Sequence, residues 1–561
     1  MKLGLIYLSI FMLSMLVVTT AQGQNCTSAT CNATNATEPS VLAALPSSSN
    51  SHSTVIVNIP SGTTTWTSGQ CLNYTVPSNV TSLTIIGAGS QTTVGGGDAT
   101  AIIDHTGCQS AINISITSSA TLLRFSGITV KEDSGSTSTT NCVVGIGGKG
   151  QLRVDHSHFW NAGVSGSGEC LGVVYGSVTG VYDHNLWDMP VGGVNNGVRV
   201  SNGQTMFGDT SGNANLSWSN PTNPGNSAYV FFEDNIYNGS ISNDCNGGGR
   251  QVFRHNTFNQ SSVQTHEMEG DLRGCRATEV YQNTFNGAVG DTITSFTAVG
   301  CRMGTCLIWG NVVNLYENVV SLQHDRTNGH PFDIPANGFG YCGTLGVTPG
   351  FSNWDGNSTT IVGYPCMDQP ARGQSDVVSG NFPNKCNMTT FPGGCSVFTG
   401  SWPHNKLEPI YEWLNQFQVG AGGGWNHTVY NPDISPAGLQ IFQANRDYYA
   451  YTLSWNGSAF TGTAFNGTVG TGSGLLSARP STCTAGPGGT FGASPTGSYG
   501  VAYWATDANS GNGQLSICTA TNTWTAVYTP FTYPHPIIAA SLSGGGGTNV
   551  AAPTSLTATV Q

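Results

Sequence analysis

The sequence predicts an all-β solenoid, a parallel β-helix in which short strands stack coil upon coil. First, one unit recurs: a short apolar strand leads into Asn or Ser, and an aromatic or apolar residue follows two positions later, as in VFRHNTFNQ and EVYQNTFNG. Second, the repeat length of about 20 to 30 residues is typical of solenoids, whose units are too short to bury their own apolar faces. Third, the strands are rich in Val, Ile, Phe and Tyr and show no helical spacing.

The repeated polar position defines a column through the middle of the chain. Its successive steps are 28, 50, 21, 27 and 28 residues, so the long step hides one coil or carries an insertion. An Asn at the same turn of each coil can hydrogen bond to the coils above and below, while the aromatic two positions later stacks in the core. The members of this column are Ser157, Asn185, Asn235, Asn256, Asn283 and Asn311.

These repeats resemble those of secreted bacterial right-handed parallel β-helix proteins, which share the superfold of pectate lyases. The segment IIGAGSQTT, residues 85–93, is similar to the opening coil of many β-helix enzymes, where Gly allows tight bends. The resemblance implies a right-handed β-helix and a carbohydrate-active protein. It does not fix one activity, because one fold hosts many functions.

Composition divides the chain into six segments. Residues 1–23 are interpreted as a secretory signal peptide, because a short apolar run follows Lys2 and small residues follow that run. We expect a flexible leader over 24–52, the β-helix over 53–345, and a loop-rich extension with a short helix over 346–445, packed on the solenoid. Residues 446–540 suggest a small β-rich module, and 541–561 a Gly-rich linker with the start of a truncated fibronectin-like strand.

Cysteine content and charge restrict the compartment and the partners. Sixteen cysteines suit an exported protein in an oxidising environment, and their proximity in sequence suggests local pairs. A formal net charge of −12 disfavours nucleic acid as a partner, and no run beyond the signal peptide is long enough to span a membrane. The suggested pairs are Cys26–Cys31, Cys71–Cys108, Cys142–Cys170, Cys245–Cys275, Cys301–Cys306, Cys342–Cys366, Cys386–Cys395 and Cys483–Cys518.

Two charged columns precede the Asn column. The first contains Asp155, Asp183, Glu233 and Arg254, and the second contains His156, His184, Asp234 and His255. In register, neighbours in a column lie about 4.8 Å apart. Stacked carboxylates along a groove could bind Ca²⁺, the one cofactor that the sequence suggests; alternatively, they line a strand end and cap turns. We predict that Asp183, Glu233 and His255 contact the substrate.

The segment HEMEGDLRGCRA, residues 266–277, holds the densest cluster of ionisable groups in a chain with only 8% charged residues. Its carboxylates could serve as acid and base on a glycosidic bond. RGCRATEVYQNTF resembles the Arg-rich strand of pectate lyases, which implies an Arg that acts beside a uronate carboxylate. The alternative is a salt-bridged loop pinned by Cys275. The predicted catalytic residues are His266, Glu267, Glu269, Asp271, Arg273 and Arg276.

A loop beyond the last clear coil, QHDRTNGHPFD, is expected to fold over the same groove and to place Asp325 and Arg326 against the substrate. The leading hypothesis is a secreted polysaccharide lyase or glycoside hydrolase that acts on an extracellular polysaccharide. The alternatives are a non-catalytic polysaccharide-binding or adhesion protein and a structural surface or filament protein. The sequence does not define an oligomeric state.

Overall fold

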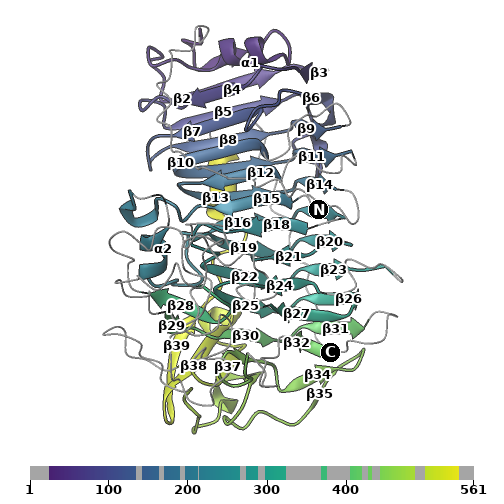
Figure 1. Cartoon of the computed structure of the whole chain (residues 1–561), viewed down its shortest axis with the longest axis vertical. Coiled ribbons are helices and arrows are strands. Elements are labelled where there is room, and N and C mark those ends of the chain that lie inside the picture. The colour runs from purple at the N-terminus through teal and green to yellow at the C-terminus, as the bar shows by residue number, and fades with distance from the viewer. Residues whose placement is uncertain are drawn as a thin grey trace, which may run out of the picture.

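The chain forms a parallel β-helix whose coils stack along one axis (Figure 1). The fold is that of a computed structural model, and it confirms the predicted all-β solenoid. The structure describes residues 25–133, 142–162, 170–189, 196–210, 212, 214–239, 241–265, 273–288, 297–323, 368–375, 405–419, 427–431, 442–486 and 499–542.

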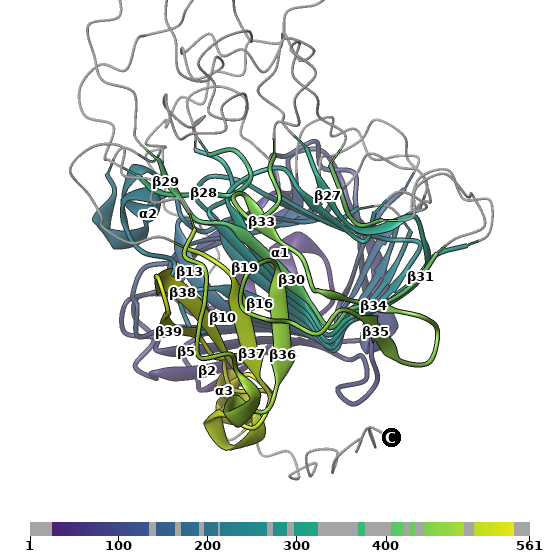
Figure 2. The same ribbon diagram turned by 90° about the horizontal axis from the view of Figure 1, so that it is seen from below.

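Each coil contributes one strand to each of three parallel sheets, here named sheets 1, 2 and 3, and Figure 2 shows these three walls from the end of the solenoid. Sheet 1 contains β1 (Thr30–Asn32), β2 (Thr54–Ile59), β5 (Ser82–Gly87), β8 (Leu122–Ser126), the second half of β10 (Cys142–Asp155), β13 (Ser177–Asp183), β16 (Val230–Glu233), β19 (Arg250–Arg254), β22 (Ala277–Tyr281), β25 (Thr305–Trp309), β30 (Ile410–Trp413) and β33 (Tyr448–Tyr449).

Sheet 2 is a separate ten-stranded sheet. It contains β3 (Gly62–Trp66), β6 (Thr100–Asp104), β9 (Thr129–Glu132), β11 (His158–Asn161), β14 (Leu186–Asp188), β17 (Ile236–Asn238), β20 (Thr257–Asn259), β23 (Thr284–Asn286), β26 (Val312–Tyr316) and β31 (Gln416–Val419).

Sheet 3 closes each coil, and its first part joins sheet 1 because β10 runs from one sheet into the other. It contains β4 (Leu72–Thr75), β7 (Ile112–Ile116), the first half of β10, β12 (Cys170–Tyr175), β15 (Asn196–Ser201) and β18 (Ile241–Cys245), then β21 (Val263–Gln264), β24 (Val299–Cys301), β27 (Asn318–Leu322) and β32 (His427–Tyr430).

The bend from sheet 1 to sheet 2 has the same structure in successive coils. The residue before each ladder Asn has a left-handed backbone, with φ of 57° at His184 and 56° at His255. The Asn that follows stabilises this bend, because its buried side chain bonds to the next coil: Asn256 Nδ2 donates to Asn283 Oδ1 over 3.0 Å. The same bond links the ladder formed by Asn185, Asn235, Asn256, Asn283, Asn311 and Asn415. The predicted Asn column is therefore confirmed.

Aromatic rings stack in the interior two positions after the Asn ladder. Phe258 and Phe285 lie parallel with ring centroids 4.4 Å apart, and Tyr237 stacks on Phe258 at 4.8 Å. These side chains are fully buried. Stacked rings beside stacked amides specify the register of adjacent coils, because a one-residue slip would move both sets to the wrong face.

The disulfides connect residues that are close in sequence, as predicted. The described pairs are Cys26–Cys31, Cys71–Cys108, Cys142–Cys170, Cys245–Cys275, Cys301–Cys306 and Cys483–Cys518. The two suggested pairs Cys342–Cys366 and Cys386–Cys395 lie outside the described residues. Multiple disulfides fit an oxidising, extracellular environment.

The N-terminal end of the solenoid is ordered, whereas the sequence suggested a loose leader. Strand β1 pairs in parallel with β2, and helix α1 (Glu38–Ala44) lies over the first coil (Figure 1). Val41 and Leu45 are buried against the core. A few apolar side chains in a Ser- and Thr-rich stretch therefore cap the open end of the first coil.

The solenoid also continues beyond residue 345, where the sequence predicts a loop-rich extension. Residues 405–419 include β30 and β31 rather than the expected short helix, and Asn415 extends the Asn ladder after Asn311. The long step between Asn185 and Asn235 is an insertion rather than a hidden coil, because β13 pairs directly with β16. The insertion carries the short helix α2 (Asn215–Ser219).

The C-terminal module packs on the outer face of sheet 1 and forms a second core there (Figure 2). Trp504 and Tyr528 are buried in this core, against Trp309 of sheet 1. The remaining strands are β28 (Arg372–Ser375), β29 (Asn405–Leu407), β34 (Leu453–Trp455), β35 (Phe460–Gly462), β36 (Thr471–Gly474), β37 (Ala502–Ala505), β38 (Gln514–Ala520) and β39 (Thr523–Tyr528), and helix α3 covers Pro536–Leu542.

Candidate functional site

The first charged column lies at the end of sheet 1 in the predicted register. Asp155 pairs with Asp183, Asp183 with Glu233, and Glu233 with Arg254 on adjacent strands. Each acid is buried and bonded to an arginine. Arg153 Nε lies 2.9 Å from Asp183 Oδ1, and Arg254 Nε lies 2.7 Å from Glu233 Oε2. The column is therefore a chain of neutralised ion pairs.

The C-terminal segment, defined here as residues 529–542, lies over this column. Arg254 donates to the carbonyl oxygens of Phe531 and Thr532, at 2.6 and 2.9 Å. The amide of His535 donates to Glu233 Oε1 over 2.7 Å. In Figure 1 the yellow end of the chain passes behind the strands of sheet 1. The structure thus places Asp183 and Glu233 beneath the protein's own chain, and their contact with substrate remains a prediction.

The second column forms the bends themselves. The rings of His156 and His184 stack with centroids 5.1 Å apart, and His255 packs against Tyr533 of the C-terminal segment at 3.8 Å. Burial, together with the nearby Arg254 charge, lowers the pKa of His255 to about 4. His255 is therefore neutral at pH 7, and its contact with substrate remains a prediction.

Arg273 and Arg276 point into the protein and bind acids from remote segments. Arg273 Nη2 lies 2.7 Å from Asp368 Oδ1, and Arg276 Nη1 lies 2.9 Å from Glu408 Oε2. Both guanidinium groups also lie over the ring of Trp218. These contacts fit the structural alternative of a salt-bridged segment, and a catalytic role for either arginine remains a prediction.

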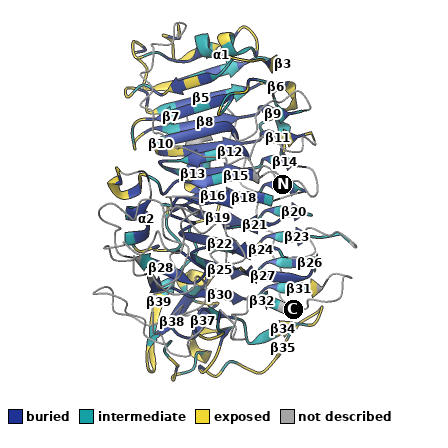
Figure 3. Ribbon diagram, in the orientation of Figure 1, coloured by how far each residue is buried: buried dark blue, intermediate teal, exposed yellow. Residues whose placement is uncertain are grey.

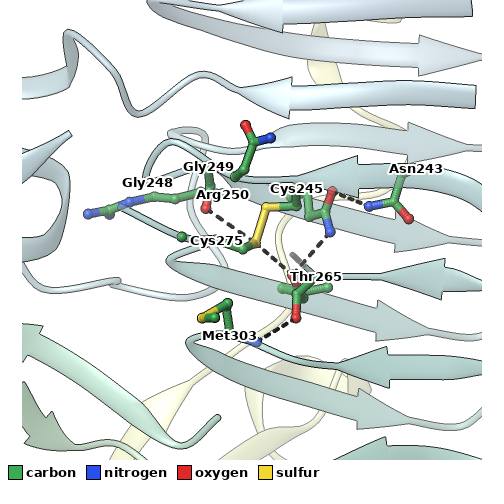
Figure 4. The surroundings of a disulfide bond; sticks show 12 residues. Asn243, Cys245, Gly248, Gly249, Arg250, Thr265, Cys275 and Met303 are labelled. Carbon is green, nitrogen blue, oxygen red and sulfur yellow. Dashed lines mark hydrogen bonds between the residues drawn. A yellow bond between two sulfur atoms is a disulfide. The ribbon is translucent and has the colours of Figure 1, made fainter. Parts of the chain in front are cut away.

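The disulfide between the two arginines fixes this segment to the neighbouring coil. Figure 4 shows Cys275 bonded to Cys245, with Gly249 beside the sulfur atoms and Met303 one coil further on. Thr265 Oγ1 accepts the backbone N–H of Met303 over 2.9 Å. Three adjacent coils are therefore tied together at Thr265 and Cys275.

Six of the predicted site residues lie outside the described residues. They are His266, Glu267, Glu269, Asp271, Asp325 and Arg326.

The outer face of sheet 2 carries a second ladder of Asn side chains, which the sequence analysis did not identify. Tyr237, Phe258 and Phe285 point inward, so the residues on either side of them point outward. Asn259 donates to Asn238 over 2.9 Å, Asn286 to Asn259 over 3.1 Å, and Asn314 to Asn286 over 3.3 Å. These side chains are half-buried, as the teal strands of sheet 2 in Figure 3 illustrate. The sequence signal for this ladder is the Asn that ends both TFN segments, residues 257–259 and 284–286.

An exposed tryptophan continues this outer column toward the N-terminal coils. Trp160 pairs with Asp188 on one side and with Lys131 on the other, and 38% of its surface is exposed. Lys131 Nζ lies 4.0 Å from the centroid of the Trp160 ring, and the His158 ring stacks parallel to Trp160 at 5.6 Å. Asp188 Oδ1 accepts a 2.6 Å bond from Asn238, so the cluster and the outer Asn ladder form one continuous line.

His158 is held between two carboxylates. Its Nδ1 lies 2.8 Å from Asp98 Oδ1, and its Nε2 lies 2.9 Å from Asp188 Oδ2. Burial alone would lower the pKa of His158, but the bonds to Asp188 and Asp98 outweigh burial and raise it above its ordinary value. The hydrogen bond from His158 lowers the pKa of Asp188. This charged cluster is thus internally balanced, while Trp160 stays partly exposed between Lys131 and His158.

The described residues contain neither a multi-ligand metal cluster nor a long apolar helix. No group of three or more His, Cys, Asp and Glu side chains in that part of the chain is arranged to hold a metal ion. No helix within the same residues has the length and apolar character needed to cross a membrane. The described residues therefore do not provide a cluster of ligands for the Ca²⁺ that the sequence suggests.

Comparison of the chain with protein-family models, with curated proteins and with solved structures gave no match.

Proposed function

We propose that the chain is a secreted protein that binds an extracellular polysaccharide along the outer face of sheet 2. The observation that carries this proposal is the continuous line from Trp160 through Asp188 to the outer Asn ladder. An aromatic ring offers a flat apolar surface to the face of a sugar ring, and side-chain amides can both donate to and accept from sugar hydroxyls.

Regular spacing supports a polymeric ligand. The coils repeat about every 4.8 Å along the solenoid, which is close to the length of one sugar unit in an extended polysaccharide. Asn238, Asn259, Asn286 and Asn314 therefore offer the same polar contact to successive units of a chain that lies along the axis. By contrast, the charged column of sheet 1 is covered by the C-terminal segment.

Replacement of Trp160 by alanine should weaken polysaccharide binding about tenfold or more, because an exposed aromatic anchor commonly contributes more than about 1.4 kcal/mol to an interface. Binding is measured by isothermal titration with the ligand selected from a polysaccharide array. Phe207→Ala is the matched control, since Phe207 is also exposed (51%) but lies in the insertion between β15 and β16. Equal affinity of Trp160→Ala and the wild type would refute this location.

Cleavage of the bound polysaccharide, by a lyase or a hydrolase, is a second candidate function. The observation that favours it is the cluster of ionisable residues from His266 to Arg276. The buried ion pairs of Arg273 and Arg276 and the disulfide of Cys275 anchor the C-terminal end of this cluster. Such an anchor can support a reactive loop, as the resemblance to the pectate-lyase superfold implies.

If the chain cleaves the polysaccharide, Glu269→Gln should reduce the release of new chain ends by about 100-fold or more, because the loss of a general acid or base typically costs that much. Unsaturated and reducing ends are measured separately, with and without Ca²⁺, to distinguish a lyase from a hydrolase. Trp160→Ala is assayed in parallel to relate binding to turnover. Binding without release of ends from the wild-type protein would leave the binding function and reject the enzymatic one.

A further inference from the structure

The outer face of sheet 2 is almost free of net charge. From Ile236 to Gln418, its two outward columns consist of Ile, Val, Thr, Asn and Gln side chains. Among the described residues of these columns, ionisable groups occur near Trp160, where Lys131, His158 and Asp188 lie on adjacent strands. The polar chemistry along most of the face is thus that of neutral amides and hydroxyls.

The cationic side chains near Trp160 already have partners within the protein. Lys131 lies over the Trp160 ring, and both nitrogen atoms of His158 are bonded to carboxylates. The side chain of Asp98 is 74% exposed and that of Asp188 33% exposed, so the acids are the more accessible charges. A polyuronate bound here would approach two carboxylates and would find, among the described residues, no cationic side chain in the outer Asn ladder. Like charges brought together in this way disfavour binding.

We propose that the ligand of this face is an uncharged, hydroxyl-rich polysaccharide rather than a polyuronate. This inference rests on the proposed binding function and specifies the class of sugar. The neutral ladder from Asn238 to Asn314 hydrogen bonds to the hydroxyl groups of successive sugar units, and the exposed part of Trp160 contacts the unit at the N-terminal end of the bound stretch. The ionisable cluster at Trp160 positions the ring and does not neutralise a ligand charge.

The test compares neutral hexasaccharides of glucose, xylose and mannose with hexagalacturonate by isothermal titration. We expect at least one neutral hexasaccharide to bind about tenfold or more tightly than hexagalacturonate. Its Kd should change by less than about twofold between about 0.05 M and about 0.5 M NaCl, because salt screens only charged contacts.

Two variants of the outer ladder provide a matched comparison. Asn286→Asp adds a negative charge on this face, and Asn286→Ser removes the amide without adding one; melting temperatures establish that both variants fold. For a neutral ligand, the two changes should weaken binding to within about threefold of each other. A polyanion would be weakened far more by the aspartate.

The outcomes distinguish the inference from the proposed function. Preferential, salt-sensitive binding of hexagalacturonate that is lost in Trp160→Ala would overturn the neutral class and leave the binding face in place. If no oligosaccharide binds, or if binding is unaffected by Trp160→Ala and by both Asn286 variants, the proposed location fails and the inference fails with it.

Discussion

Replacement of Arg254 by alanine is expected to lower the free energy of unfolding by about 3 to 5 kcal/mol, the largest effect of a single substitution that we predict. Arg254 is fully buried and donates to Glu233, Tyr281, Phe531 and Thr532. Its removal leaves Glu233 buried without its ion partner and leaves two carbonyl oxygens of the C-terminal segment without this donor. Above the raised pKa of Glu233, about 7, the uncompensated buried charge is the dominant part of this cost.

The same substitution should loosen the C-terminal segment before it unfolds the solenoid. Hydrogen exchange of residues 529–542 should increase in Arg254→Ala, while exchange of the strands of sheet 2 stays close to that of the wild type. Chemical denaturation gives the loss of stability. The double variant Glu233→Gln with Arg254→Ala is the control, since it removes the unpaired charge and should recover part of the loss. A double variant as unstable as Arg254→Ala would show that the charge of Glu233 is not the cause.

The cost of Arg254→Ala should also depend on pH. Burial raises the pKa of Glu233 to about 7 even with Arg254 beside it, whereas its unfolded value is near 4.5. A raised folded-state pKa gives stability that is present at low pH and lost as pH rises through the folded-state value. The charge of Arg254 lowers this pKa, so its removal raises the pKa further and makes ionisation of Glu233 more costly. At about pH 5 Glu233 is protonated in both folded proteins, so the difference in stability between the wild type and Arg254→Ala should be smaller there than at about pH 8.

The internal order of the solenoid could be predicted from sequence because it depends on a local repeat. Each Asn of the ladder contacts the Asn of the next coil, so equal spacing in sequence becomes contact in space. The register of the charged column followed from the same repeat. Only where a long excursion separates two coils, as between Asn311 and Asn415, did the spacing conceal the contact.

What lies on the outside of the coils could not be predicted in this way. Arg273 binds Asp368, which is 95 residues away in sequence, and Arg276 binds Glu408, which is 132 residues away. The C-terminal segment covers Glu233, and the residue that binds it, His535, is 302 residues away in sequence. No repeat relates these partners, because they join the solenoid to segments with a different composition. The outer Asn ladder could have been found, since its residues repeat at the spacing of the inner ladder.

Asn256→Ala is expected to lower the free energy of unfolding by about 3 kcal/mol. Asn256 Oδ1 accepts both the backbone N–H and the side-chain amide of Asn235, each over 3.0 Å. Its own Nδ2 donates to Phe232 O and to Asn283 Oδ1. Alanine leaves these groups without the partner that Asn256 supplied, in an interior where each unsatisfied polar group costs about 1 to 3 kcal/mol.

Asn286→Ala is the matched control, because Asn286 belongs to the outer ladder and makes the same type of amide bond to a neighbouring coil. Asn256 is 1% exposed, whereas Asn286 is half-buried and water can replace its partners. Its loss should therefore cost less than about 1 kcal/mol. Denaturant titration of the two variants measures both values. Similar losses in the two variants would show that burial of the inner ladder does not determine its contribution, and that stacking of the coils depends on backbone pairing and aromatic packing instead.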